Sequence, residues 1–227
     1  MSGVNHKLDW ETETSPEADP VSTLSTGMDV LDRKFGGGIP AGRIVALSAA
    51  PASQSELFLH EMAAVRETVY LTTERTAADV ERTLERSDAS LDQIEIHELG
   101  GDSPLTDARA VVENIEEQTT LIVDPIDPLE RRDESEYRAF VNELRTRTTE
   151  TGGLTVLHCL EGRDVPPQRD RTEYLADIIF ELITERRGGS IENSLSIPKS
   201  RGWRSLSETI ELDLTSDVTI DVSRKIA

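Results

Sequence analysis

The side chains with the potential for chemistry are few, and they lie at the ends of predicted strands and helices. Lys199 and Arg201 are two residues apart in IPKSRG. Because side chains two apart on a strand share one face, both cations could point at one anion. Glu56 falls in the first turn of a predicted helix, where the helix dipole favours a negative charge. Two further carboxylates follow apolar runs, Asp124 in TTLIVDP and Glu74 in YLTTER.

Alternating strands and helices must position these side chains. Short, nearly continuous apolar runs predict buried strands at residues 43–49, 67–73, 119–126, 153–160 and 176–183. Apolar residues three and four apart predict helices at 53–67, 76–88, 103–118 and 133–153. This order indicates an α/β fold with a doubly wound, mainly parallel sheet and helices on both faces. The alternating segments 192–202, 208–215 and 218–224 predict antiparallel strands added at one edge.

A glycine-rich turn leads into the first of the buried strands. In STGMDVLDRKFGGGIPAGRIVALSA, residues 25–49, we expect a short helix from about 28 to 35, stopped by Gly36, Gly37 and Gly38. The pattern S-T-G-x-x-x-L-D-x-x-x-G-G-G-I-P-x-G before an apolar strand resembles the start of KaiC-type and RadA-type archaeal ATPases of the RecA-like P-loop family. The resemblance extends over residues 22–203. It implies a RecA-like domain at 21–227, preceded at 1–20 by an acidic arm that we expect to be disordered.

The phosphate-binding loop implied by this resemblance lacks its diagnostic residues. In the family a G-x-x-x-x-G-K-[ST] loop cradles phosphates with its amides, reaches them with its lysine and holds Mg²⁺ with its hydroxyl. Without gaps, Ala49, Gln54, Ser55 and Glu56 align with these positions; the whole loop comprises Ala49, Ala50, Pro51, Ala52, Ser53, Gln54, Ser55 and Glu56. We expect a self-filled loop that does not bind a triphosphate productively. The alternative is a rearranged loop that still binds ATP and Mg²⁺ through its amides.

Two carboxylates match positions to which the resemblance assigns hydrolysis. Asp124 matches the acidic residue that orients Mg²⁺ and water in active relatives, although an aspartate at a strand end can also be a simple cap. Glu74 matches the first of two acidic residues that serve water activation, and Arg75 replaces the second. Glu74 and Asp124 are therefore vestigial catalytic candidates, and no catalytic residue, cofactor or metal site is assigned.

The pair Lys199 and Arg201 matches the K-x-R-G segment that, in KaiC-like rings, reaches a neighbouring subunit's γ-phosphate. The resemblance makes these two residues candidates for acting in trans. Alternatively, they decorate an edge strand and protect it from unwanted pairing. The scarcity of lysine makes the match informative, because only four of the 227 residues are lysines.

The amino-acid composition indicates the salt content of the surrounding solvent more than it indicates a binding partner. The formal charge is -20, with 44 acidic and 24 basic residues. Such an acidic, lysine-poor chain is typical of the cytosol of a salt-loving microbe, where ~1 M salt shortens the Debye length to about 3 Å. A dedicated cationic partner is the alternative interpretation. The single cysteine, Cys159, and the lack of a long apolar run predict a cytoplasmic protein without a membrane span.

Three other kinds of site are not expected. His6, His60, His97 and His158 have no ligand spacing with one another or with Cys159, so no zinc site is predicted. The His158–Cys159 pair is interpreted as a buried strand end rather than a nucleophile and its base. Residues 162–174, GRDVPPQRDRTEY, predict an exposed loop where RecA-like recombinases contact DNA. Acidic residues lie among its arginines, so nucleic-acid binding is not expected.

The leading functional hypothesis is therefore a catalytically silent KaiC/RadA-like domain, a regulatory or assembly subunit that forms homo- or hetero-oligomers with RecA-like ATPases. It could lend Lys199 and Arg201 to a neighbour's active site. Two alternatives stay open: a divergent ATPase that uses Glu74 and Asp124, and an accessory protein of DNA recombination or repair.

Overall fold

Helices and strands follow one another in the alternating order that the apolar pattern predicts. The computed structural model describes residues 22–87, 90–204 and 207–220. Its elements are β1 (Thr23–Leu24), α1 (Asp29–Phe35), β2 (Ile39–Pro40), β3 (Arg43–Ala49), α2 (Glu56–Ala64), β4 (Thr68–Thr72), α3 (Ala77–Leu84), the 3₁₀ turn η1 (Leu91–Gln93), β5 (Ile94–Glu98), α4 (Pro104–Val112), β6 (Thr120–Asp124), α5 (Asp127–Glu130), α6 (Glu134–Thr151), β7 (Leu154–Leu160), α7 (Arg169–Leu175), β8 (Ile178–Arg187), β9 (Ser190–Ser200), β10 (Ile210–Leu214) and β11 (Val218–Ile220).

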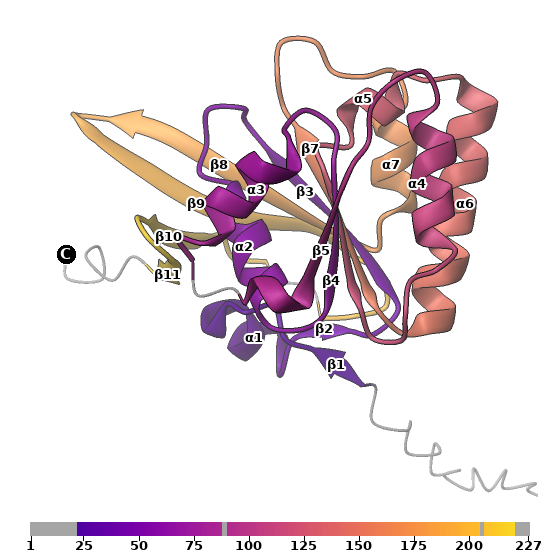
Figure 1. The fold of residues 1–227 in the computed structure, drawn as a ribbon. Helices are drawn as coiled ribbons and strands as arrows, with labels where there is room; N and C mark the ends of the chain where they lie inside the picture. Colours follow the sequence, from indigo (N-terminus) through magenta and orange to yellow (C-terminus); the bar gives the residue numbers. More distant parts are fainter. Residues whose placement is uncertain (1–21, 88–89, 205–206, 221–227) are drawn as a thin grey trace, which may run out of the picture.

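A nine-stranded sheet organises the fold in the order β11-β10-β9-β8-β3-β7-β6-β4-β5. The strands from β8 to β5 run parallel, whereas β9, β10 and β11 are antiparallel. Figure 1 shows α2 and α3 on one face of the sheet and α4, α6 and α7 on the other. The predicted doubly wound, mainly parallel sheet with antiparallel C-terminal strands is confirmed.

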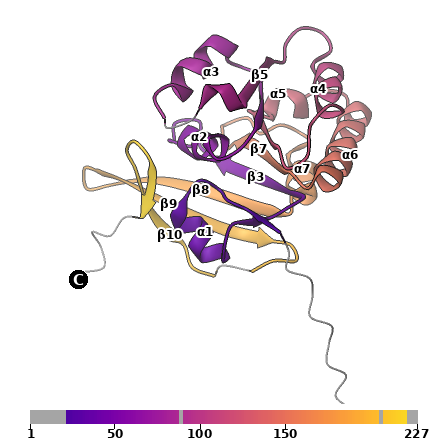
Figure 2. The same ribbon diagram turned by 60° about the horizontal axis from the view of Figure 1, so that its bottom comes forward.

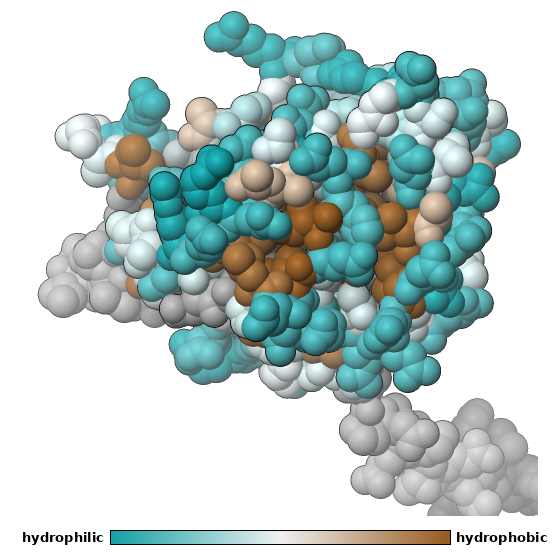
Figure 3. All heavy atoms as spheres, in the orientation of Figure 1, coloured by the Kyte–Doolittle hydropathy of each residue, from teal (hydrophilic) through white to brown (hydrophobic). Residues whose placement is uncertain are grey.

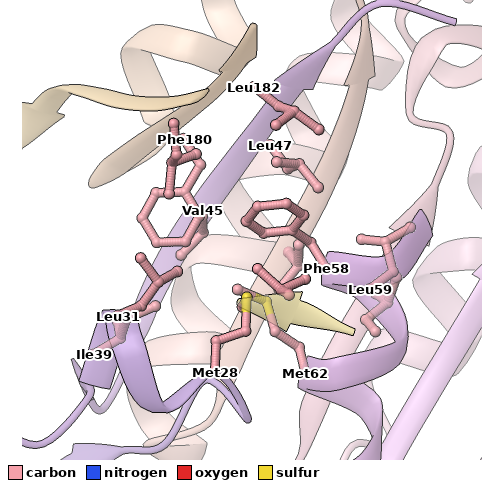
Figure 4. Packing of buried hydrophobic residues seen from close by; sticks show 14 of the residues in the cluster. Met28, Leu31, Ile39, Val45, Leu47, Phe58, Leu59, Met62, Phe180 and Leu182 are labelled. Carbon is pink, nitrogen blue, oxygen red and sulfur yellow. The ribbon is translucent and has the colours of Figure 1, made fainter. Parts of the chain in front are cut away.

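Each face of the sheet has its own apolar core. One core joins the α1–α3 side to β3, β8, β9 and β10, and Figure 4 shows Met28, Phe58, Met62 and Phe180 packed within it. The other core joins α4, α5 and α6 to β6 and β7. Figure 2 shows α1 below the sheet, beside β8, β9 and β10. Because strands covered on both faces bury every side chain, β3 and β6 are continuous apolar runs.

The turn before β3 is held by hydrogen bonds that explain the motif spacing. Asp32 accepts bonds from Ser25 Oγ at 2.5 Å and Thr26 Oγ1 at 2.7 Å, so the S-T and the later Asp form one closed turn. Helix α1 ends at Gly36 in the left-handed conformation. Gly38 has a φ of +113°, and a Cβ there would lie 2.2 Å from the Leu24 carbonyl oxygen. The motif therefore has a structural role, since it forms the closed turn that leads into β3.

Strand β5 and residues 162–174 differ from the sequence-based expectation. Strand β5 was not predicted, because Ile94 and Ile96 alternate with polar residues, which is typical of an edge strand rather than a buried one. Residues 162–174 are not simply an exposed loop, since helix α7 begins at Arg169, whose side chain is buried. The proposed N-terminal arm, 1–20, lies outside the described residues.

Candidate functional site

The carboxyl ends of the parallel strands meet at one edge of the sheet, where open α/β sheets bind their ligands. The loop at 50–55 follows β3 there, and α2 begins at Glu56. Strands β4 and β6 are in register, with Thr72 opposite Asp124. Two predicted candidates, Glu56 and Asp124, are thus brought together with Arg75, each following a different strand.

The loop closes on itself through short-range hydrogen bonds. The Ser53 amide donates to the Ala50 carbonyl oxygen at 2.9 Å, and the Ser55 amide donates to Ser53 Oγ at 3.4 Å. Ser55, which aligns with the family's lysine, is buried. At the end of β3, Ser48 Oγ donates to Glu161 at 2.8 Å. Two amides that would otherwise be available for a phosphate are therefore used within the loop.

Arg75 joins the two carboxylates that align with the family's magnesium-binding positions. Its Nη1 lies 3.0 Å from Glu56 Oε1, and its Nη2 donates to Asp124 Oδ2 at 2.6 Å. We call this arrangement of Glu56, Arg75 and Asp124 the Arg75 bridge. The Glu56 side chain therefore extends from the start of α2 towards Arg75.

Both oxygens of Asp124 have partners. Oδ1 lies 2.6 Å from His158 Nδ1, and Oδ2 accepts from Tyr70 Oη at 2.5 Å as well as from Arg75. Burial by itself would raise the pKa of Asp124, but the His158 hydrogen bond, Tyr70 and Arg75 outweigh it and lower the pKa to about 2. Asp124 is thus held as a buried carboxylate whose oxygens are engaged.

Two histidines in this region carry a buried ring nitrogen without a partner. His158 Nε2 and His60 Nε2 have no hydrogen-bond partner among the described residues. Burial lowers the pKa of His60, which lies on α2 near Glu56 and Arg75. His158 had been interpreted from sequence as a buried strand end. The structure confirms its burial and adds its bond to Asp124.

Glu74, the second vestigial catalytic candidate, does not join the Arg75 bridge. It is exposed and lines an open cleft of about 490 Å³. The wall of the cleft includes Pro51 from the loop after β3, Asp127 at the start of α5 and Leu160 at the end of β7. The two carboxylates that the resemblance assigns to hydrolysis therefore face different surroundings.

The site does not fit a magnesium ion held as in the family. The family's hydroxyl is replaced by Glu56, and the guanidinium of Arg75 lies between Glu56 and Asp124, where it supplies the positive charge itself. Among the described residues, no group of three His, Cys, Asp or Glu side chains could hold a metal ion. No step that depends on magnesium is derived from this geometry.

In the sheet register Lys199 lies three residues along β8 from the position opposite Ala49, on the side away from the loop. Lys199 is opposite Ile179 near the start of β8, whereas Ala49 at the loop is opposite Leu182. Lys199 Nζ and Arg201 Nη2 each donate to the Tyr174 carbonyl oxygen at 2.9 Å. Both cations also lie over the exposed Tyr174 ring, at 5.8 and 5.7 Å from its centroid. The two cations thus lie together at Tyr174, although β9 ends at Ser200 and Arg201 belongs to the turn after it.

Arg169 is a buried cation that sequence reasoning had placed in an exposed loop. It lies 3.0 Å from each of Asp127, Glu130 and Glu161, and it also donates to the Leu160 carbonyl oxygen. Its three partners lie 8 to 42 residues away in sequence, so no local pattern in 169–175 predicts its burial. Arg169 ties α7 to the carboxyl edge of the sheet.

The architecture of the sheet and its helices is a KaiC-like RecA fold. A solved structure of a KaiC-like protein from the hyperthermophilic archaeon Pyrococcus horikoshii OT3 is similar to this chain with a TM-score of 0.74 and 20% identity, covering 89% of this chain and 100% of that chain. The chain belongs to the family described as "Family of unknown function (DUF7125)", whose model matches residues 23–227. No curated protein matches. In the described ranges, every helix is too short or too polar to cross a bilayer.

Proposed function

We propose that this protein is a catalytically silent KaiC/RadA-like subunit that regulates or assembles with RecA-like ATPases. The observation that carries the proposal is the Arg75 bridge. It places a permanent cation between the two positions that hold the metal in active relatives. The backbone amides of Ser53 and Ser55 also donate hydrogen bonds within the loop. The amides that would bind phosphate and the carboxylates that would bind a metal ion are therefore both paired within the chain.

The cations on β9 fit a role in trans better than one in cis. Their register places them near the start of β8, away from the chain's own loop. Lys199 and Arg201 converge on one exposed surface around Tyr174, which suits contact with an anion presented by a neighbour. We therefore propose that this surface faces the nucleotide site of an adjacent RecA-like ATPase.

Calorimetric titration with Mg-ATP and Mg-ADP in molar KCl tests the silent-loop proposal. No heat of binding is expected for the natural protein. A variant carrying Ser55→Lys, Glu56→Thr and Arg75→Glu returns the family's lysine, hydroxyl and second acidic residue and serves as the matched comparison, with circular dichroism verifying that it is folded. Micromolar binding by the natural protein would contradict the proposal and favour a divergent ATPase, for which the cleft beside Glu74 would be the place to look.

The trans role has a separate test. A RecA-like ATPase from the same organism is assayed with the natural protein and with the Lys199→Ala, Arg201→Ala variant. The variant should abolish any change in the partner's turnover, whereas Lys34→Ala on α1 should not. An unchanged effect of the double variant would sink the proposed role of these cations.

A further inference from the structure

Strand β5 leaves one edge of the nine-stranded sheet unpaired within the described residues. It forms hydrogen bonds with β4 alone. The Leu99 amide donates to the Thr72 carbonyl oxygen at 2.7 Å, which directs the backbone groups of odd-numbered residues towards β4. Because these groups alternate along a strand, the N–H and C=O groups of Ile94, Ile96 and Glu98 point outwards. An edge of this kind can accept another strand.

The surface around this edge is partly apolar. Figure 3 shows hydrophobic atoms on the face that carries β5, interrupted by hydrophilic side chains. Ile94 and Ile96 are only partly buried against the core on the α3 side of the sheet. On the opposite face of the strand, His97 Nε2 lies 2.9 Å from Glu95 Oε1. The strand therefore offers an apolar face and a face carrying one acid and one imidazole.

We propose that β5 pairs antiparallel with β5 of a second copy of this chain, about a two-fold axis at Ile96. The segment is self-complementary in this register. Ile96 lies opposite its own copy, and Glu95 lies opposite the partner's His97 and the reverse, so the acid–imidazole contact is made twice across the axis. The outward backbone groups of residues 94, 96 and 98 then bond to those of residues 98, 96 and 94 of the copy.

The one unfavourable pairing in this register is already relieved within the chain. Glu98 would lie opposite the partner's Ile94, but its carboxylate is turned to the Ala77 amide, from which it accepts a bond at 2.5 Å. Nearby acids, including Asp92 and Glu67, add repulsion between two copies. Because salt screens charges that are not in contact more than the paired ones, dimerisation should strengthen from low salt to molar KCl.

Sedimentation velocity of the full chain over a wide concentration range in molar KCl tests this pairing. The natural protein should be dimeric at high concentration. His97→Glu alone should weaken the dimer about tenfold or more, since it places two carboxylates opposite each other twice. Glu95→Lys alone should also weaken it, since it removes both acid–imidazole contacts. The double variant Glu95→Lys, His97→Glu should recover dimerisation. Glu136→Lys on α6 is the control for the change in net charge and should have no effect.

A covalent test avoids dependence on charge. Ile96→Cys places two thiols at the axis in a hydrogen-bonded pair, where the Cα atoms of neighbouring strands are about 5.5 Å apart, within reach of a disulfide. Mild oxidation should give a disulfide-linked dimer at low protein concentration, while Ile191→Cys, at an exposed position near the start of β9, should not; the native Cys159 is buried. A monomer at every concentration, dimers that ignore both charge variants, or equal cross-linking at both cysteines would overturn the proposal.

Discussion

Arg75 and Asp124 are in contact through a hydrogen bond of 2.6 Å at the point where β4 and β6 end side by side. At the position where the resemblance implies an acid, Arg75 is thus a cation, and it neutralises Asp124. The charges of Arg75 and Glu56 are also complementary, since each supplies the charge that the other needs.

Arg75→Ala should lower the free energy of unfolding by about 3 kcal/mol, because it leaves the buried carboxylate of Asp124 without its cation. Urea denaturation in molar KCl measures the change. Arg82→Ala is the matched control: its ion pair with Asp79 is exposed and should contribute no more than about 1 kcal/mol. Equal losses in the two variants would show that the Arg75 bridge has no special structural role.

Stability should depend on Asp124 in acid. Its pKa is lowered from 3.8 to about 2 in the folded protein, so the folded state binds this proton less readily than the unfolded chain. The contribution, about 2 kcal/mol, is fully present above about pH 4 and is lost as the pH falls towards 2. Unfolding curves of the natural protein and Asp124→Asn should converge over this interval. Asp107→Asn, an exposed aspartate on α4, should run parallel to the natural protein.

His60 should affect stability at a higher pH than Asp124 does. Burial lowers its pKa below 6.5, so the folded protein resists a proton that the unfolded chain accepts. The natural protein should therefore lose stability as the pH falls below 6.5, relative to His60→Gln, which does not titrate there. Unfolding free energies between pH 7 and 5 check this expectation. A constant difference between the two proteins would mean that His60 titrates alike in both states.

Arg169→Met should be among the most destabilising single substitutions, at about 3 to 5 kcal/mol, because it leaves Glu130 buried and unpaired. Burial already raises the pKa of Glu130 against the opposing effect of Arg169. Adding Glu130→Gln should recover part of the loss. Arg171→Met, in the same helix but paired with the exposed Glu134, should cost about 1 kcal/mol or less in the same denaturation experiment.

Sequence alone predicts the central strands well, because β3, β4, β6, β7 and the start of β8 are continuous apolar runs that only a sheet covered on both faces can use. It failed at β5, where Ile94 and Ile96 alternate with Glu95 and His97. That alternation belongs to a strand with one neighbour, which a search for buried runs does not detect.

The candidate site was only partly predictable. The alignment that the resemblance implies predicts a cation at position 75 and an acid at position 56. Their contact could not be predicted, because it depends on the register of β4 and β6 and on the direction taken by a long, flexible side chain. The partners of Arg169 were missed for the same reason, since they come from the ends of β7 and α5.

A positive charge that is part of the chain cannot be diluted, chelated or exchanged. Where a bound ion contributes to stability in proportion to the logarithm of its concentration, the contribution of the guanidinium of Arg75 does not depend on the concentration of magnesium. The protein should therefore have the same melting temperature with excess magnesium as with a chelator.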